Sequence, residues 1–398
     1  MPSSEMFHAS APSAESPPSK APVPGATEAA GVRTLVLTSK AQNKPSDEEL
    51  RRLIAADLIP DTLSADAAIG ATLLDDRYFN AVGGIGTRIL NRLPFIVAQM
   101  VVFMLSAGRY DAVVTWGERH TVLVAGLLRL RWRRPAHVAI LMWPSKRNAT
   151  LLRLAFRVVD RFLVFAPLQR RYVQQELRVP GERFVDVRAP VDTRFWHPMG
   201  GDGDLICAVG QEMRDYRTFL EALRPLDTPC HIAVGTGLFD PGFDTRANGN
   251  EQIRFLQGST AEGSAPVLPS NVALGPKPRL ELRELYSRAR FVVVPLVPSD
   301  MDNGITVTTE ALAMGKPVIC TESPGQVGLL EDGVNCIRVP PFDADALREA
   351  IVALWNDPAL CARLGAAGRQ SVEERHSFDQ YKTALVQAVV EAVATRRR

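Results

Sequence analysis

Short apolar runs alternate with longer amphipathic stretches along most of the chain. In the first half, the runs at 32–38, 111–116, 137–143, 161–167 and 183–190 predict strands, and the stretches between most of them have the apolar spacing of helices. These strands are too apolar to face water on either side, which is typical of a parallel sheet covered on both faces. The alternation of strand and helix with short connections therefore predicts a doubly wound α/β domain.

The same alternation begins again after a break. Residues 192–204 contain Pro198 and several glycine and polar positions, which are typical of a linker between domains. Strands are then predicted at 205–210, 231–237, 271–275, 290–296 and 318–320, followed by helices to the end of the chain. We therefore expect an α/β fold of two Rossmann-like, doubly wound parallel-sheet domains that face each other across a cleft. Ligands of such folds bind beyond the carboxyl ends of the strands.

Domain boundaries follow from these patterns. Residues 1–30 are rich in Pro, Ser and Ala with few large apolar side chains, which predicts a disordered tail, and they do not resemble a secretory signal. We expect residues 31–197 to form the first domain and residues 198–380 the second. Residues 381–398 are expected to form a carboxyl-terminal helix that packs back toward the first domain.

Residues 88–106 are the most apolar predicted helix. The apolar run at 93–105 is too short to span a bilayer, and Arg88, Arg92 and Arg109 flank it. It is either a core helix packed on the sheet, which we favour, or a helix lying in a membrane interface. Before it, residues 45–80 are expected to be helical and irregular, beginning with a helix capped by Ser46, and VGGIG at 82–86 is expected to be a turn.

The stretch from Ser299 to Ser323 has the pattern of a loop, a short helix and a strand. Its polar residues up to Gly304 favour turns, residues 305–314 favour a helix that ends at Gly315, and residues 318–320 favour a buried strand. A polar loop before a helix is a potential anion site, because unpaired N–H groups and the helix dipole point at it. An acid, Glu310, lies inside this helix. The pattern predicts a site for the diphosphate and ribose of a nucleotide-sugar.

Composition and charge restrict the number of domains and the kinds of partner that the chain can have. With 398 residues and 46% hydrophobic residues, the chain can form two domains with separate cores. The five cysteines are scattered, which favours a reducing compartment and argues against a structural zinc. The net charge of +2 is unevenly distributed along the chain. Residues 31–197 contain 25 Lys and Arg against 15 Asp and Glu, whereas residues 198–398 contain 20 Lys and Arg against 26 Asp and Glu. A basic first half favours an anionic surface or ligand, although a solvated arginine-rich face explains it equally well.

Several segments, in the same order, resemble a known family. EALAMGKPVICTESPG and the residues after it, up to NDP at 356–358, are similar to the carboxyl-terminal half of family-4 type retaining glycosyltransferases with the GT-B fold (glycosyl transferases group 1). APVDTRFWHP resembles the linker of that family, and ICAVGQEMRDYRTFLEAL resembles its strand, glycine turn and basic residue. NVALGP and ELYSRARFVVVP resemble the segments before its acidic motif. The resemblance covers residues 110–398 and is strong from residue 204.

The resemblance implies roles for individual residues. Glu310 matches the acid that receives the ribose hydroxyls, and Asp302, eight residues earlier, matches the acid that contacts the transferred sugar, with Asp300 as a rival. Arg214 matches a cation that neutralises the leaving diphosphate, but Gln211 stands where the family has a second one, so Arg217 or Arg290 would have to supply that charge. We therefore expect the catalytic residues to be Asp302, Arg214 and Glu310, and the donor to be bound by Gly210, Gln211, Arg214, Gly235, Asn303, Gly304, Ile305, Thr306 and Glu310.

The first domain should hold the acceptor. Candidates that follow strand ends on this side are Trp116, Glu118, Arg119, His120, Trp143 and Lys146. The implied activity is that of a retaining, hexosyltransferase-type enzyme. It would use a nucleotide-diphosphate sugar and a sugar or lipid-linked acceptor, such as a cell-envelope glycan. No metal-ligand pattern is visible, so we expect neither a metal nor a cofactor, and the arginines lack the interleaved aromatic residues of a nucleic-acid-binding motif.

Two other functions are compatible with the same fold. An epimerase or phosphorylase with the same fold would act on a related sugar nucleotide, and a catalytically silent protein would only bind one. The departures at Asp302 and Gln211 keep the silent protein open. We expect a cytoplasmic protein, with an anionic membrane surface as a further partner that would place it at the inner face of the membrane.

Overall fold

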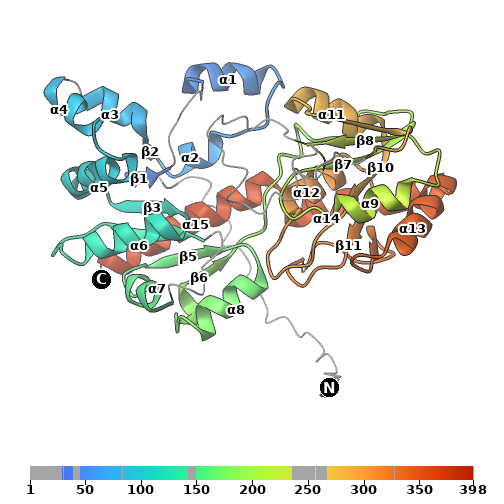
Figure 1. Ribbon diagram of the computed structural model, residues 1–398. Helices are drawn as coiled ribbons and strands as arrows, with labels where there is room; N and C mark the ends of the chain where they lie inside the picture. The colour runs from blue at the N-terminus through green and yellow to red at the C-terminus, as the bar shows by residue number, and fades with distance from the viewer. Residues whose placement is uncertain are drawn as a thin grey trace.

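The computed structural model describes Ala29, residues 31–38, 45–82, 84–141 and 149–234, Leu256, and residues 267–326 and 328–397. It contains two six-stranded sheets whose neighbouring strands are all parallel, and helices flank each sheet (Figure 1). The expected fold class, two Rossmann-like domains of the GT-B type, is therefore confirmed.

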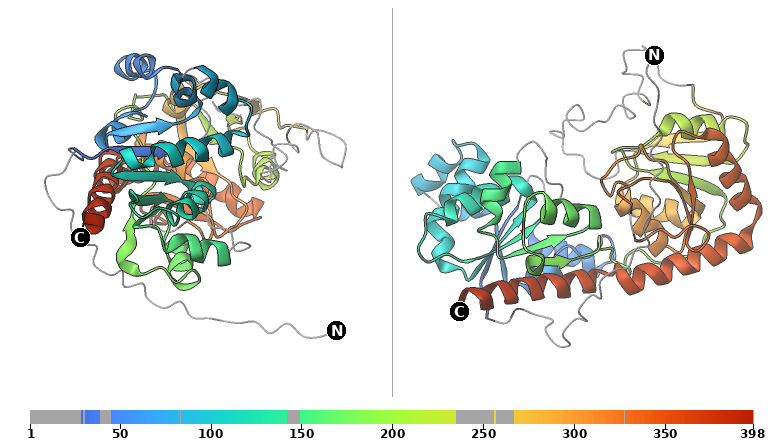
Figure 2. Two further views of the ribbon diagram at one scale, coloured as in Figure 1. Left: turned by 90° about the vertical axis from the view of Figure 1, so that its left-hand side faces the viewer. Right: turned by 90° about the horizontal axis from the view of Figure 1, so that it is seen from below.

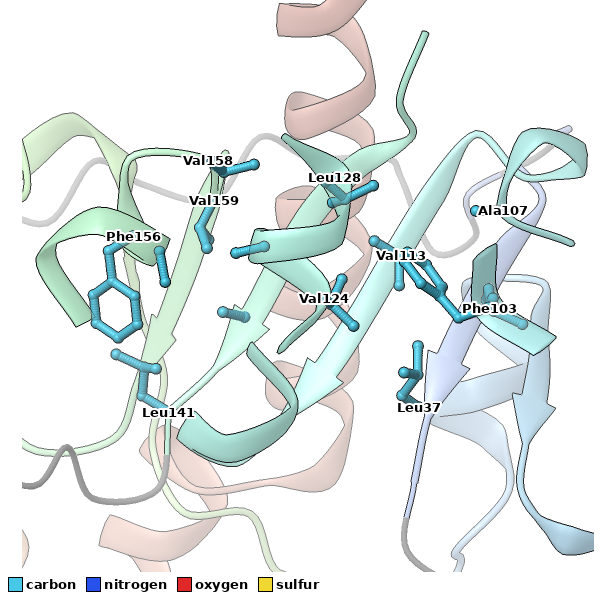
Figure 3. Close-up of a cluster of buried hydrophobic side chains, with 14 of the residues drawn as sticks. Leu37, Phe103, Ala107, Val113, Val124, Leu128, Leu141, Phe156, Val158 and Val159 are labelled. Carbon is cyan, nitrogen blue, oxygen red and sulfur yellow. The ribbon is translucent and has the colours of Figure 1, made fainter. Parts of the chain in front are cut away.

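The first sheet has the strand order β2-β1-β3-β4-β5-β6. Its strands are β1 (Thr34–Leu37), β2 (Ala71–Leu74), β3 (Ala112–Trp116), β4 (Ala136–Ile140), β5 (Arg161–Val164) and β6 (Phe184–Asp186). The helices around it are α1 (Asp47–Ala55), α2 (Ser64–Ala68), α3 (Asp76–Val82), α4 (Gly84–Leu90), α5 (Phe95–Ser106), α6 (Gly117–Leu128), α7 (Ala149–Phe156) and α8 (Pro167–Gln175). Side chains of α5 and α6, among them Phe103 and Val124, pack on one face of this sheet (Figure 3).

The second sheet has the order β12-β11-β10-β7-β8-β9. Its strands are β7 (Leu205–Val209), β8 (Cys230–Ala233), β9 (Val272–Gly275), β10 (Ala289–Val294), β11 (Val318–Thr321) and β12 (Cys336–Val339). Its helices are α9 (Tyr216–Leu223), α11 (Arg279–Arg288), α12 (Ile305–Ala313), α13 (Ala344–Asn356) and α14 (Pro358–Arg375). All five cysteines are buried and unpaired.

The last helix, α15 (Phe378–Arg397), returns to the first sheet. Its apolar side chains, such as Leu385 and Val389, pack with the β4 residues Val138 and Ile140. Two ion pairs tie its end to the start of β5, from Arg161 to Glu391 at 3.1 Å and from Arg396 to Asp160 at 2.8 Å. Figure 2 shows α14 and α15 running along one side of the molecule from the second domain to the first.

The chain crosses between the domains twice, and the two crossings are hydrogen-bonded to each other. The Val191 N–H donates to the His376 carbonyl at 2.9 Å, and the Phe378 N–H donates to the Val191 carbonyl at 3.1 Å. The two connections therefore form one short ladder between the sheets.

Three local expectations were wrong. The helix predicted at 88–106 is two helices, because Pro94 cannot continue the first one and precedes the start of α5 at Phe95. Residues 84–86 of VGGIG begin α4 instead of forming a turn. The segment 45–80 contains the edge strand β2 in addition to helices, although the cap of α1 is as predicted, with the Glu49 N–H donating to Ser46 Oγ at 3.1 Å.

Candidate active site between the two sheets

The mouth of α12 is built as the sequence pattern predicts. Gly304 is the N-cap and has φ of +81°, a conformation that other residues adopt only with strain. A Cβ on Gly304 would lie 2.9 Å from Val294 Cγ1, so the close approach to β10 also requires glycine. The first backbone bond of α12 runs from the Thr308 N–H to the Gly304 carbonyl at 2.9 Å, and the amides of Ile305 and Thr306 precede it. These amides and the helix dipole can hold an anion.

The loop before α12 is held by the neighbouring loop after β11. Asn303 Nδ2 donates to Ser299 Oγ at 2.7 Å, and Gln326 Nε2 donates to the Asn303 carbonyl at 2.8 Å. The Ser299 N–H donates to Ser323 Oγ at 3.1 Å. These bonds fix the loop in place without a ligand, which favours binding because less chain has to be ordered.

Glu310 lies in α12, partly buried, and faces α11. The Tyr286 hydroxyl donates to Glu310 Oε2 at 3.2 Å. Burial raises the pKa of Glu310 to about 7, against the opposing effects of the Arg279 charge and the Tyr286 hydrogen bond. Because the pKa of Glu310 is close to neutral pH, hydroxyl groups that donate to its carboxylate would shift it toward the ionised form.

Asp302 lies in a narrow pocket lined by both domains. The first domain contributes Arg188 and Ala189, and the second contributes Asp302, Ile305 and Thr308 with Gln326, Leu329, Leu330 and His376; Phe165 completes the wall. Burial raises the pKa of Asp302 to about 7, and the Arg188 charge opposes that rise. The pocket therefore joins the acid expected to contact the sugar with a cation from the opposite domain.

Four polar residues of this pocket are not among the residues predicted from the sequence, namely Arg188, Thr308, Gln326 and His376. Arg188 follows β6 at the carboxyl edge of the first sheet, whereas the strand predicted at 183–190 included it, so no signal in the sequence showed that its side chain belongs to the site. His376 Nδ1 lies 3.1 Å from the Ala189 carbonyl, and burial lowers the pKa of His376 to about 4. His376 Nε2 and Thr308 Oγ1 are buried and have no hydrogen-bond partner within the described part of the chain. They leave the pocket two unsatisfied polar atoms.

Arg214 is turned into the domain. It is only 4% exposed, and its Nε and Nη1 donate to the Val209 carbonyl at 2.9 Å and the Glu212 carbonyl at 2.8 Å. It lies directly beneath Gly210, where a Cβ would approach Arg214 Nη2 to 2.4 Å. Arg214 is therefore a buried residue and not a surface cation. Its charge supports the glycine turn that Gln211 follows.

Arg290 and Arg217, the two residues expected to supply the charge that Gln211 lacks, lie in different places. Arg290 lies near the amino end of β10, where it stacks on the Trp355 ring at 4.2 Å and donates to the Gly203 carbonyl. The carboxyl end of that strand carries the site, so the expectation that Arg290 compensates for Gln211 is wrong. Arg217 is exposed at the start of α9.

Four of the acceptor-side candidates lie together at the carboxyl end of β3. Trp116 ends that strand, and Glu118, Arg119 and His120 are in the first turn of α6. Burial lowers the pKa of His120, whose Nε2 lies 3.0 Å from Gln99 Oε1. Gln99, which the sequence analysis missed, donates to the carbonyls of Thr38 and Leu74 just beyond β1 and in β2. Trp143 and Lys146, like the donor-side Gly235, lie outside the described residues.

Residues 265–357 match the family model described as glycosyl transferases group 1. These residues contain α11, α12 and the loop between β10 and α12. The chain carries a glycosyl transferases group 1 domain.

Curated relatives and a solved structure match longer parts of the chain than the family model does. The alpha-maltose-1-phosphate synthase of Mycobacterium tuberculosis is 24% identical over 360 residues, which cover 82% of each chain. The D-inositol 3-phosphate glycosyltransferase of Streptomyces bingchenggensis is 35% identical over 119 residues, 30% of this chain and 25% of that protein. The structure of Anabaena HepE in complex with UDP-glucose shares the fold with a TM-score of 0.63 and 15% identity, covering 92% of this chain and 100% of that one.

No group of three His, Cys, Asp or Glu side chains among the described residues is arranged to hold a metal ion. None of the described helices is both long and apolar enough to cross a membrane.

Proposed function

We propose that this group 1 glycosyltransferase is a retaining, hexosyltransferase-type enzyme that takes a sugar from a nucleotide-diphosphate sugar. The observation that carries the proposal is α12, whose N-terminal residues Ile305 and Thr308 line the pocket of Asp302 and whose Glu310 lies about one and a half turns after Ile305. One short helix thereby offers sites for a diphosphate and for a ribose at the carboxyl edge of the second sheet.

Each group then has a definite task. The amides of Ile305 and Thr306 bind the diphosphate, and the Glu310 carboxylate accepts hydrogen bonds from the two ribose hydroxyls. Asp302 accepts a hydrogen bond from the transferred sugar. As the bond to the sugar breaks, negative charge grows on the diphosphate, and the helix terminus stabilises it together with Arg188 across the pocket. Arg214 has an indirect role, because its hydrogen bonds to the Val209 and Glu212 carbonyls hold the turn at Gly210 in place.

The acceptor is expected at the carboxyl edge of the first sheet, near Trp116, Arg119 and His120. The basic first half of the chain supports an anionic, lipid-linked or cell-envelope acceptor at a membrane surface. HepE was solved with UDP and with UDP-glucose, so uridine diphosphate is the first nucleotide to test.

The test is donor hydrolysis and donor binding by the full chain with a panel of uridine, guanosine, adenosine and thymidine diphosphate sugars. One of them should raise the melting temperature and release free nucleoside diphosphate. Glu310→Gln should abolish both effects, whereas Glu284→Gln, an exposed acid on α11, should leave them unchanged. Binding without any release of nucleotide, at every pH tried, would exclude the enzyme.

That last outcome would favour the second candidate, a protein that binds a sugar nucleotide without turning it over. The buried, carbonyl-bonded guanidinium of Arg214 and the neutral Gln211 are the observations that support it. Both reduce the positive charge that a departing diphosphate would meet on its own domain.

A further inference from the structure

Helix α5 has two apolar faces, and only one of them is covered. Ala98, Val102 and Phe103 pack in the core of the first domain. Val97, Val101 and Leu105 follow one another at a spacing of four residues and are 43%, 41% and 79% exposed. Residues at this spacing share one side of a helix, so they form a stripe along the outer face of α5. Ile89 and Leu93, 57% and 37% exposed, precede the stripe in the chain.

A groove opens beside the stripe. Tyr78, Ile89, Leu90, Val102, Leu105 and Arg109 line it together with Ser106, and its volume is about 320 Å³. Its walls are mostly apolar, and the Arg109 guanidinium is the one charged group among them. Figure 1 shows α3, α4 and α5 together at one end of the first domain.

The loop between α6 and β4 extends the apolar surface past the end of α5. Arg131 Nη1 donates to the Met104 carbonyl at 2.7 Å and so fixes this loop against the last turn of α5. On either side of Arg131, Leu130 is 77% exposed and Trp132 is fully exposed. A tryptophan with no cover in a soluble domain is unusual, whereas tryptophan is enriched where protein meets the headgroup region of a bilayer.

The charges around this surface are of one sign. Residues 84–110 contain Arg88, Arg92 and Arg109 and no Asp or Glu. Arg129 and Arg133 flank the exposed tryptophan and leucine. Within the described residues, no carboxylate lies within 4.0 Å of any of these five guanidinium groups. Their charge is left for an anionic partner.

We propose that the α5 surface, made of Ile89, Leu93, Val97, Val101, Leu105, Leu130 and Trp132, docks on a bilayer of anionic phospholipid. The stripe and Trp132 enter the boundary between headgroups and acyl chains, the arginines contact the phosphates, and the groove takes up part of an acyl chain. This inference rests on the proposed function for its purpose, since it would present the enzyme to a lipid-linked acceptor.

The position of the surface fits that purpose. Gln99, in the second turn of α5, donates to carbonyls just beyond β1 and at the end of β2, and contacts His120. The first turns of α5 therefore lie at the carboxyl edge of the first sheet, beside the residues expected to hold the acceptor. Leu105, Leu130 and Trp132 lie toward the opposite edge, where the chain enters β3 and β4, so a docked bilayer would extend along α5 from that edge toward the acceptor residues.

The experiment is co-sedimentation of the full chain with vesicles of phosphatidylcholine alone and of phosphatidylcholine mixed with phosphatidylglycerol, at low and at moderate salt. We expect binding to the anionic vesicles that weakens with salt. Leu105→Asn combined with Trp132→Ala should lower the partition constant by about tenfold or more, since two large apolar side chains no longer enter the interface. Arg88→Gln combined with Arg92→Gln should reduce the preference for anionic vesicles.

A matched control is Val334→Asn combined with Phe342→Ala, two exposed apolar residues of the second domain, which should bind as the unchanged protein does. All variants should keep their melting temperature and its shift with uridine diphosphate, so that a failure of docking is distinguished from a failure of donor binding. Equal binding by the α5 variants and the control overturns the proposal. So does a dimer in light scattering that the α5 variants dissociate, because a second copy would then cover the surface.

Discussion

Tyr286→Phe removes one hydroxyl and leaves the ring in place, and it tests whether the environment of Glu310 controls nucleotide binding. The hydroxyl donates to Glu310 Oε2 at 3.2 Å, and the ring packs edge-on against Trp196 with centroids 5.6 Å apart. Phenylalanine keeps the ring contact. Because the ionised carboxylate loses a donor while the protonated one loses little, the pKa of Glu310 should rise above its present value of about 7.

The size of the effect follows from the strength of such a bond. A hydrogen bond to a charged group contributes about 1.5–3 kcal/mol, and about 1.4 kcal/mol corresponds to one pKa unit. A rise of about one unit would leave Glu310 mostly protonated at pH 7, and a protonated carboxyl accepts more weakly from hydroxyl groups. The ionised fraction of Glu310 at pH 7 then falls from about one half to about one tenth, so we expect the Kd for uridine diphosphate at pH 7 to rise about fivefold and most of this loss to be recovered by pH 9.

Calorimetric titration of the two proteins between pH 6 and pH 9 measures this shift. Tyr381→Phe is the matched control, because the Tyr381 hydroxyl is buried and has no hydrogen-bond partner within the described residues. It should leave the Kd and its pH profile unchanged. A loss of affinity in Tyr286→Phe that is the same at every pH would refute the role of Glu310 ionisation.

Three further perturbations have defined outcomes. In urea unfolding, Gly304→Ala should lower the free energy of unfolding by about 2–4 kcal/mol, because the backbone has positive φ and the new side chain clashes with β10. Gly200 also has positive φ, +69°, but no atom lies near the new Cβ, so Gly200→Ala should lower it by only about 1–2 kcal/mol. Arg396→Gln removes the ion pair of Asp160 but leaves the hydrogen bond from the His137 N–H, so it should destabilise by about 1 kcal/mol at pH 7; burial raises the pKa of Asp160, and the loss should shrink in acid as that group is protonated. The kcat/KM for the donor should fall below about pH 7 as Asp302 is protonated, and Arg188→Ala should move that fall to higher pH; an unmoved profile would separate Arg188 from Asp302.

The fold was predictable because its signals are local and repeated. Each apolar run with its following helix indicates one βα unit, and the right-handed connection of such units leaves few arrangements. The exceptions are short or interrupted elements. The strand Ala71–Leu74 is an edge strand in which three of the four residues are only partly buried, so it lacks the longer apolar run of the central strands, and Pro94 divides an apolar stretch that looks continuous by composition.

The site was predictable where one segment builds it and not where two segments meet. Gly304 and Glu310 lie in the same loop and helix, so their relative placement follows from their spacing in the sequence. Arg188 and His376 reach the pocket from segments nearly two hundred residues apart, and nothing in either segment indicates the other. The direction of the Arg214 side chain was also beyond sequence reasoning, because two backbone carbonyls decide it.

The return of α15 to the first sheet has a consequence for the order in which the protein is made. The β-strands of the first domain are complete once Asp186 has been synthesised, yet one face of their sheet is covered by Leu385, Val389 and their neighbours. A nascent chain therefore carries an uncovered apolar sheet face during the whole synthesis of the second domain. Amino-terminal domains usually fold first and on their own. Here the first domain can only be finished last, and a chain that stops before α15 should aggregate instead of leaving two independent halves.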